Sequence, residues 1–434
     1  MEDRLIPTYI INLKHRPDRR QHALNEFSGR NEFDVHVVDA CQHAVGAVGL
    51  WKTIKNIIEL AVSAENKFVL ICEDDHQFTE SYSIKLLLES IEEGQQLKAD
   101  IICGGVSSFT SAIPISDKLF WVENFCGLQF TIVFQSLFQS ILKAQFSDGD
   151  AADLKISELT NNKYFIYEFI SIQKAFGYSD VTGENNREGR VSELFKRSLL
   201  GARILKDVTS FYRKTETFQP ASDAFDDVIL PTYIINLAER SERKTHIEQE
   251  FHGKSEFAIN IVEACKHPIG SLGLWQSIRK IVALAIQNDE DVIIICEDDH
   301  EFSKDYSKKF LLKNIIEAYQ QGADILLGGI SNFERAVPIS SDRFWINTFF
   351  GTQFVVVFRK LFQAILDEPF DDTVTADGVF ADLAVNKMVL YPFISTQKYF
   401  GYSDVNAENS IDGHIEQLFT TAARRLGQFP NPCN

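Results

Sequence analysis

One sequence is written twice in this chain of 434 residues. PTYIINLKHRPDRR begins at Pro7, and PTYIINLAERSERK begins 224 positions later, at Pro231. The same offset, without a gap, relates Trp51 to Trp275, Asp75 to Asp299, Gly104 to Gly328 and Gln129 to Gln353. A repeat of this length is a whole domain, because the unit of a solenoid spans only about 20–50 residues. The sequence therefore predicts two tandem copies of one fold.

The copies are expected to span residues 1–214 and 228–434. The segment between them, TETFQPASDAFDD at residues 215–227, is polar and contains a proline, as linkers often do. Two domains also suit the chain length, at roughly 100–200 residues per domain. We expect the two halves to pack together.

Composition excludes some classes of partner. The formal net charge of -18 argues against nucleic acid, whose phosphates attract basic surfaces. No run of about 18 apolar residues is present, which predicts no membrane span. The seven cysteines contain no C-x-x-C pair and suit free thiols in a reducing compartment. We expect a cytoplasmic protein, with peripheral contact at a membrane left open for a lipid-linked acceptor.

Strand and helix patterns alternate along each copy. In the first copy, residues 8–13, 33–40, 67–75 and 99–105 read as strands, and residues 19–27, 49–64 and 83–97 have apolar side chains at helical spacing. Such alternation predicts an α/β fold in which helices flank a mostly parallel sheet. Ligands of such sheets bind outside the carboxyl ends of the strands.

Acidic clusters follow the most apolar strand of each copy. The segments are KFVLICEDDHQF at residues 67–78 and DVIIICEDDHEF at residues 291–302. The clusters are Glu73, Asp74 and Asp75 in the first copy and Glu297, Asp298 and Asp299 in the second. Crowded carboxylates raise each other's pKa unless a cation lies among them, and oxygen ligands suit Mg²⁺ or Mn²⁺. The alternative is a solvated loop that contains three acids by chance.

Polar residues also follow the first strand of each copy. They are Asn12, Arg16 and Arg19 in the first copy and Asn236, Arg240 and Arg243 in the second. Two arginines three positions apart at a helix start can bind an anion, together with free backbone N–H groups. The alternative is an exposed basic helix start that makes surface ion pairs. Arginines for a diphosphate and acids for a divalent cation, on one rim, describe a nucleotide-diphosphate site.

The order YIINLKHRPDRR, GLWKTI, LICEDDHQF resembles glycosyltransferase family 25 over the first two-thirds of each copy. Members of that family transfer sugars to lipopolysaccharide, or galactose to collagen hydroxylysine. The resemblance implies two GT-A-like domains that bind a nucleotide sugar, with Mn²⁺ or Mg²⁺ held by Asp75 and Asp299. It implies that the other acids and the Asn and Arg residues named above contact the donor. The family's Ser-His pair is absent from both copies.

The later part of each copy supplies further candidates. The resemblance implies that Asp153 in AADLKI and Asp377 in TADGVF are the general bases, which remove the proton from the acceptor hydroxyl. The alternative for both is a helix N-cap. The segments FISIQKAFGYSD and FISTQKYFGYSD suggest a late loop at the metal or diphosphate. Its candidates are Gln173, Ser179 and Asp180 in the first copy and Gln397, Ser403 and Asp404 in the second.

Histidine and tryptophan receive structural interpretations. His76 and His300 follow the acids directly, and we interpret them as solvated residues at a strand exit. Trp51 and Trp275 lie at helical spacing with aliphatic residues, and we interpret them as core.

The sequence thus favours an inverting glycosyltransferase. It would move a hexose from a nucleotide sugar, UDP-linked, to a hydroxyl of a glycan, lipid-linked or protein acceptor. One alternative is a non-catalytic pair of modules that bind a glycan or a partner protein. Another is a metal-dependent phosphohydrolase, which is disfavoured because Asn12 and Asn236 stand where its Asp nucleophile would be.

Overall fold

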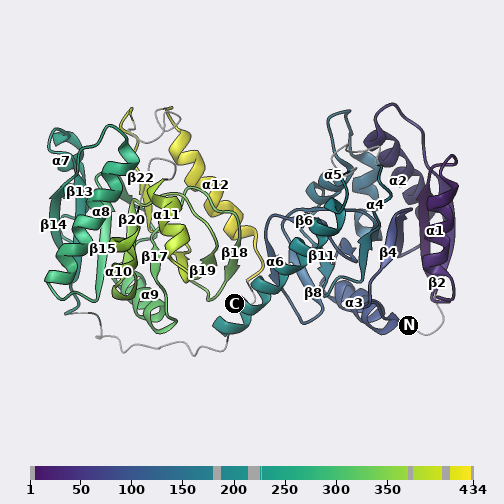
Figure 1. Cartoon of the computed structure of the whole chain (residues 1–434), viewed down its shortest axis with the longest axis horizontal. Helices are drawn as coiled ribbons and strands as arrows, with labels where there is room; N and C mark the ends of the chain where they lie inside the picture. Colours follow the sequence, from purple (N-terminus) through teal and green to yellow (C-terminus); the bar gives the residue numbers. More distant parts are fainter. Residues whose placement is uncertain are drawn as a thin grey trace. The chain divides into compact units, whose positions relative to one another are not determined.

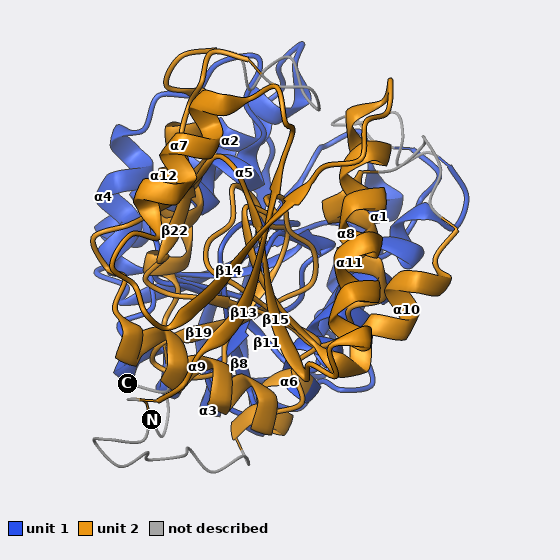
Figure 2. Cartoon of the chain, turned by 90° about the vertical axis from the view of Figure 1, so that its left-hand side faces the viewer, with its two compact units in different colours: residues 1–207 blue, residues 208–434 orange. Residues whose placement is uncertain are grey.

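The computed structural model describes residues 5–178, 187–213, 225, 227–369, 375–402 and 411–431. The chain divides into two compact units, Met1–Asp207 and Val208–Asn434 (Figure 2). Four candidate residues, Ser179, Asp180, Ser403 and Asp404, lie outside the described residues, as does most of the expected linker. In the part of the chain that is described, no helix combines the length and the apolarity needed to cross a membrane.

The first unit alternates strands and helices (Figure 1). Its elements are β1 (Ile6–Asn12), α1 (Pro17–Phe27), β2 (Phe33–Asp39), α2 (Gly46–Ser63), β3 (Phe68–Glu73), β4 (His76–Phe78), α3 (Ile84–Gln96), β5 (Ile101–Cys103), β6 (Ser108–Phe109), β7 (Ala112–Pro114), β8 (Leu119–Val122), β9 (Phe125–Cys126), β10 (Phe130–Phe134), α4 (Gln135–Lys143), α5 (Ala152–Glu158), β11 (Lys163–Ile166) and β12 (Ser171–Gln173), followed by α6 (Arg190–Arg213).

The second unit has a closely similar order. Its elements are β13 (Leu230–Asn236), α7 (Ser241–Glu250), β14 (Phe257–Glu263), α8 (Gly270–Gln287), β15 (Val292–Glu297), β16 (His300–Phe302), α9 (Lys308–Gln320), β17 (Ile325–Leu327), β18 (Ala336–Pro338), β19 (Arg343–Ile346), β20 (Phe354–Phe358), the 3₁₀ helix η2 (Arg359–Leu361), α10 (Phe362–Asp367), α11 (Ala376–Leu383), β21 (Lys387–Leu390), β22 (Ser395–Gln397) and α12 (His414–Gln428).

Each unit is built on one eight-stranded sheet. The strand order is β2-β1-β3-β10-β5-β11-β8-β7 in the first unit and β14-β13-β15-β20-β17-β21-β19-β18 in the second. All strands of the first sheet run in one direction except β10 and β8, and the same holds for the second sheet except β20 and β19. The predicted α/β class, with a mostly parallel sheet flanked by helices, is confirmed.

The central strand that precedes the acids is enclosed on every side. β3 pairs with β1 on one edge and β10 on the other, and its four inner residues are buried. In the second unit, helices α8, α10 and α11 lie on one side of β13, β14 and β15, while α7 and α12 lie on the other (Figure 2). This burial explains the continuous apolar run, because no face of the strand meets water. Trp51 and Trp275 are buried core residues, as predicted.

Register places the two polar motifs side by side. β1 and β3 are parallel, with Ile11 opposite Glu73, and β13 and β15 repeat this pairing with Ile235 opposite Glu297. Because parallel neighbours end at the same edge, the residues that follow them leave the sheet at one rim. The predicted meeting of the asparagine–arginine motif and the acidic motif is therefore built into the strand pairing.

The interpretation of His76 and His300 as solvated residues is wrong. Both are 0 % exposed, because they begin the short strands β4 and β16, which turn back into the unit and pair with β12 and β22. In the second unit, His300 Nδ1 lies 2.8 Å from Ser395 Oγ. Burial lowers the pKa of His300 to about 3.

We predict that His300→Asn removes part of the acid sensitivity of folding. Below pH 6.5 the unfolded chain binds a proton that folded His300 does not accept, so wild-type stability falls as the pH drops from 6.5 toward 3. The limiting slope is about 1.4 kcal/mol per pH unit for one proton. The stability of the wild type relative to the variant should shrink over this range in urea unfolding. His252→Asn, an exposed position in the same unit, is the reference substitution. A constant difference over the whole range would contradict the prediction.

Candidate functional site

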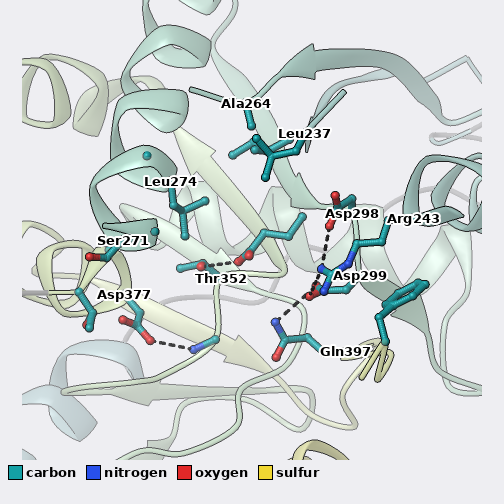
Figure 3. A pocket seen from close by; sticks show the side chains of 18 of the residues that line it. Leu237, Arg243, Ala264, Ser271, Leu274, Asp298, Asp299, Thr352, Asp377 and Gln397 are labelled. Atoms are coloured by element: carbon teal, nitrogen blue, oxygen red, sulfur yellow. Dashed lines mark hydrogen bonds and ion pairs between the residues drawn. The ribbon is translucent and has the colours of Figure 1, made fainter. Parts of the chain in front are cut away.

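A cavity of about 780 Å³ opens at the carboxyl ends of β13, β14 and β15 (Figure 3). Residues from several segments line it, among them Leu237, Arg240 and Arg243 after β13; Ala264, Lys266 and His267 after β14; Gly270, Ser271 and Leu274 of α8; Glu297, Asp298 and Asp299; Gly351 and Thr352 before β20; Asp377 of α11; and Gln397 of β22. The predicted arginines, acids, general base and glutamine of the second copy therefore meet in one place.

The middle acid of the motif points into the protein. Asp298 is buried and accepts hydrogen bonds from Asn236 Nδ2 at 2.9 Å and from Arg243 Nη1 at 3.0 Å. In the first unit, Asp74 accepts from Asn12 Nδ2 at 2.8 Å. The asparagine at the end of the first strand thus holds the acid that follows the neighbouring strand, which gives it a structural role at the rim.

The last acid lies at the cavity and shares the same arginine. Asp299 Oδ2 is 3.0 Å from Arg243 Nη1, and its Oδ1 is 3.5 Å from Gln397 Nε2. Burial raises the pKa of Asp299 to about 6, although Arg243 acts in the opposite direction. In the first unit, burial raises the pKa of Asp75 to about 7, and Arg19 Nη1 lies farther away, at 3.8 Å.

The first acid differs between the units. Thr352 Oγ1 donates a hydrogen bond of 2.6 Å to Glu297, whereas Leu128 stands at the matching position before β10. Burial, followed by the charge of Asp299, raises the pKa of Glu297 to about 8. The pKa of Glu73 is raised well above its usual value for the same reasons. Sequence reasoning missed Thr352, because a position that changes between the copies carried no repeated signal.

The candidate general bases are held by backbone N–H groups. Asp377 Oδ2 accepts from Gly351 at 3.3 Å, and its Oδ1 accepts from Gly378 at 3.1 Å. Gly351 has φ +105°, and a Cβ at this residue would lie 2.9 Å from Gln353 Oε1, so glycine is required. Asp153 and Gly127 repeat the arrangement at 3.0 Å.

The N-cap interpretation of these acids is wrong. The N-cap of α11 is Thr375, whose side chain accepts from Gly378 N–H, and the N-cap position of α5 is Ala151. Asp377 and Asp153 lie inside the first turn of their helices. Their carboxylates instead fix the glycine turn that precedes β20 or β10.

The arginines do not form an exposed helix start. Arg243 is buried, its guanidinium carbon lies 4.8 Å from the ring centre of Phe400 and 4.7 Å from that of Tyr402, and its Nη2 donates to the Tyr402 carbonyl at 3.2 Å. Arg240 lies over Tyr402 at 5.0 Å and also lines the cavity. In the first unit, Arg16 and Arg19 are likewise buried. The alternative of an exposed helix start therefore fails for Arg16, Arg19 and Arg243, which are buried.

The start of α8 forms a second wall of the cavity. The helix begins at Gly270, without a side-chain cap and without an acid in its first turn, and Gly270 and Ser271 line the cavity. Gly273 lets the helix approach the loop after β14, because a Cβ there would lie 2.6 Å from the Cys265 carbonyl oxygen. Uncapped N–H groups and the helix dipole make this wall electropositive. Lys266 also lines this wall, and its Nζ lies 2.9 Å from Glu239 Oε2.

The acids as arranged do not fit a resident divalent cation. The Nη1 atom of Arg243 lies at hydrogen-bond distance from Asp298 and from Asp299, at the place where a shared metal would have to bind (Figure 3). Within the described residues, no three His, Cys, Asp or Glu side chains are grouped so as to hold a metal ion. A cation shared by Asp298 and Asp299 would require the arginine to move, and one shared by Asp74 and Asp75 would displace Arg19.

Comparison with known proteins gives no sequence match and solved structures of low similarity, so the fold is described by its own strand order. No family model and no curated protein sequence matches the chain. Matching solved structures include A197 from STIV (13 % identity over 41 % of this chain and 87 % of that chain, TM-score 0.28). A second match is apo UDP-glucose pyrophosphorylase, with 11 % identity over 44 % of this chain and 82 % of that chain and a TM-score of 0.28. A third is a putative glucose-1-phosphate thymidylyltransferase from Bacillus anthracis, with 13 % identity over 45 % of this chain and 75 % of that chain and a TM-score of 0.23.

We predict that Glu297→Gln stabilises the second unit at alkaline pH. Folded Glu297 keeps its proton up to about pH 8, whereas the unfolded side chain loses it near pH 4.5, so wild-type stability falls as the pH rises from 4.5 to 8. Glutamine resembles the protonated acid and carries no such dependence. Its advantage should grow with a limiting slope of about 1.4 kcal/mol per pH unit in this range.

The measurement is chemical unfolding of both proteins in EDTA between pH 4.5 and 9. Glu248→Gln, an exposed position on α7, serves as the control. A variant that is less stable than wild type at pH 8 would show that Glu297 is bound as a stabilising carboxylate.

Proposed function

We propose that this protein is a glycosyltransferase with GT-A-like domains, which moves a hexose from a nucleotide sugar to an acceptor hydroxyl. The observation that carries the proposal is one cavity in which an electropositive wall, at Gly270, Ser271 and Lys266, faces an acidic wall at Glu297 and Asp299. A nucleotide sugar has the matching polarity, because its diphosphate is anionic and its sugar hydroxyls donate hydrogen bonds to carboxylates.

The electropositive wall would bind the diphosphate. The start of α8 offers unpaired N–H groups, and Arg240 and Lys266 add charge beside it. Helix starts bind phosphate groups through this combination of N–H groups and dipole. The same groups would stabilise the negative charge that develops on the leaving diphosphate. A UDP-linked hexose is the donor that we propose.

Asp377 would act as the general base of the second unit, and Asp153 of the first. Asp377 would accept the proton of the acceptor hydroxyl, whose oxygen attacks the anomeric carbon as the bond from that carbon to the diphosphate oxygen breaks. One such displacement inverts the anomeric centre. The backbone N–H groups of Gly351 and Gly378 hold the carboxylate in one orientation, and carboxylate oxygens retain further lone pairs.

The acceptor classes that we propose are a glycan, a lipid-linked saccharide or a protein hydroxyl. Binding of Mn²⁺ or Mg²⁺ by Asp75 and Asp299 stays a prediction. Gln173 and Gln397 belong to the same proposal, since Gln397 reaches Asp299 from β22.

One observation favours a second function, the binding of a glycan or partner protein without catalysis. Arg243 places one positive charge between Asp298 and Asp299 from inside the protein, so part of their charge is offset without a ligand. A binding module could keep such a site for its shape and polarity alone.

We predict that Asp377→Asn and Asp153→Asn each remove part of the turnover of nucleotide sugars. Loss of a general base lowers the rate by about 10²–10⁴-fold. Each single variant should therefore retain only the activity of its unchanged unit, and the turnover rate of the double variant should fall at least about 100-fold. The measurement is nucleotide release from a panel of sugar nucleotides, with and without Mn²⁺. Asp382→Asn, an exposed position on α11, should remain as active as wild type.

The outcomes separate the two functions. Loss in one single variant alone would assign the chemistry to that unit. Binding of a nucleotide sugar or glycan without any turnover in the wild type would favour the non-catalytic module. If no sugar nucleotide binds at any metal concentration, the transferase proposal fails.

A further inference from the structure

Each acidic motif contains a positive charge supplied by the chain itself. Arg243 Nη1 lies 3.0 Å from Asp298 Oδ1 and 3.0 Å from Asp299 Oδ2. In the first unit, Arg19 Nη1 lies 3.3 Å from Asp74 Oδ1 and 3.8 Å from Asp75 Oδ2. One nitrogen between two carboxylates of consecutive residues is the position that a shared cation would take.

The arginine is held there by contacts that do not involve the acids. Phe400 and Tyr402 stack against the guanidinium of Arg243, and the Tyr402 carbonyl accepts from its Nη2. The side chain is only 6 % exposed. Phe176 and Tyr178 surround Arg19 in the same way, at 4.7 and 4.3 Å. Such contacts fix the guanidinium in place, so it is not a mobile surface charge that a solvent cation displaces at no cost.

A divalent cation and the guanidinium compete for the same oxygen. A metal on Asp299 Oδ2 would coordinate at about 2.0–2.2 Å, which places it within a few Å of Arg243 Nη1. Two positive centres that close together repel strongly in a partly buried site. We infer that Arg19 and Arg243 are the built-in counter-cations of the acidic motifs, and that the two aspartates of a motif share a divalent cation only when the arginine leaves.

The two units differ in how firmly the arginine holds the acids. Arg243 Nη1 lies 3.0 Å from Asp299, whereas Arg19 Nη1 lies 3.8 Å from Asp75. The Thr352 side chain donates a hydrogen bond to Glu297, whereas Leu128, at the matching position, has no side-chain donor for Glu73. The first unit is therefore the one in which a divalent cation displaces the arginine more readily. This inference deepens the proposed function, because it concerns regulation of the same site.

The experiment uses Mn²⁺ alone, so it does not depend on catalysis or on the donor. Free Mn²⁺ is counted by electron paramagnetic resonance in titrations of the EDTA-treated full chain. The proteins are the wild type, Arg243→Gln, Arg19→Gln and the double variant. The matched control is Arg359→Gln, a half-exposed arginine of the second unit that pairs with Asp289 and Asp291.

The wild type should bind Mn²⁺ weakly, with a dissociation constant of about 1 mM, as in other low-affinity oxygen sites. Each Arg→Gln substitution should create one site at least about tenfold tighter, the usual size of a coupling between two sites. The double variant should gain two such sites, and Arg359→Gln should match the wild type. The weak binding of the wild type should be that of the first unit, where the arginine holds the acids less closely.

Folding provides an independent readout. Removing the arginine leaves two buried carboxylates without an opposite charge, so Arg243→Gln should melt at a lower temperature than wild type. Mn²⁺ should restore that loss and should raise the melting temperature of the wild type much less. If the variant does not fold in either condition, Asp299→Asn decides the matter in the wild-type background. It should leave Mn²⁺ affinity unchanged, because the inference holds Asp299 to be unavailable as a ligand.

Two results would overturn the inference. One is two Mn²⁺ sites of micromolar affinity in the wild type that Arg243→Gln and Arg19→Gln weaken or leave unchanged. The other is a loss of Mn²⁺ binding on Asp299→Asn alone. Absence of sugar-nucleotide turnover would count against the proposed function and would leave this inference untouched, because the Mn²⁺ titration contains no nucleotide.

Discussion

The buried pairing of an arginine with an aspartate at the sheet rim is the interaction on which the site depends. Arg243 comes from the segment after β13, Asp298 from the segment after β15, and the stacking rings from the segment after β22. Removing the arginine would leave Asp298 and Asp299 without an opposite charge in a poorly solvated place, which is strongly destabilising. The pair therefore joins distant parts of the chain and holds the segments after β13, β15 and β22 together at the edge of the cavity.

Much of the fold could be predicted from periodicity and from the internal repeat. The apolar run before the acids indicated an enclosed strand, and β3 and β15 are enclosed on both faces and both edges. The rule that parallel strands present their carboxyl ends together placed Asn236 near Asp298. These inferences held because they depend on local pattern and on general properties of sheets, which hardly vary from one protein to another.

The rest depends on contacts between residues far apart in the sequence. The pattern around His300 gave no sign that a three-residue strand would turn it into the core against Ser395. Likewise, two arginines at a helix start could face a phosphate or the protein's own acids, and only the tertiary contacts with Phe400 and Tyr402 decide between them. Thr352 carried no signal because its counterpart in the other copy is Leu128.

The small sheet of β16 and β22 has a consequence for the modular nature of the site. Its register places His300 opposite Gln397, and the Lys398 N–H donates to the Asp299 carbonyl at 2.8 Å. The acidic motif is therefore hydrogen-bonded directly to β22 and to the residues after it, which carry the rings that stack on Arg243. Arg243 and the acids come from the first part of the copy, but the rings that hold the arginine come from the segment after β22. A recombination boundary placed before β22 would separate the arginine from the surface that orients it, so the segment after β22 has to be inherited together with the acidic motif.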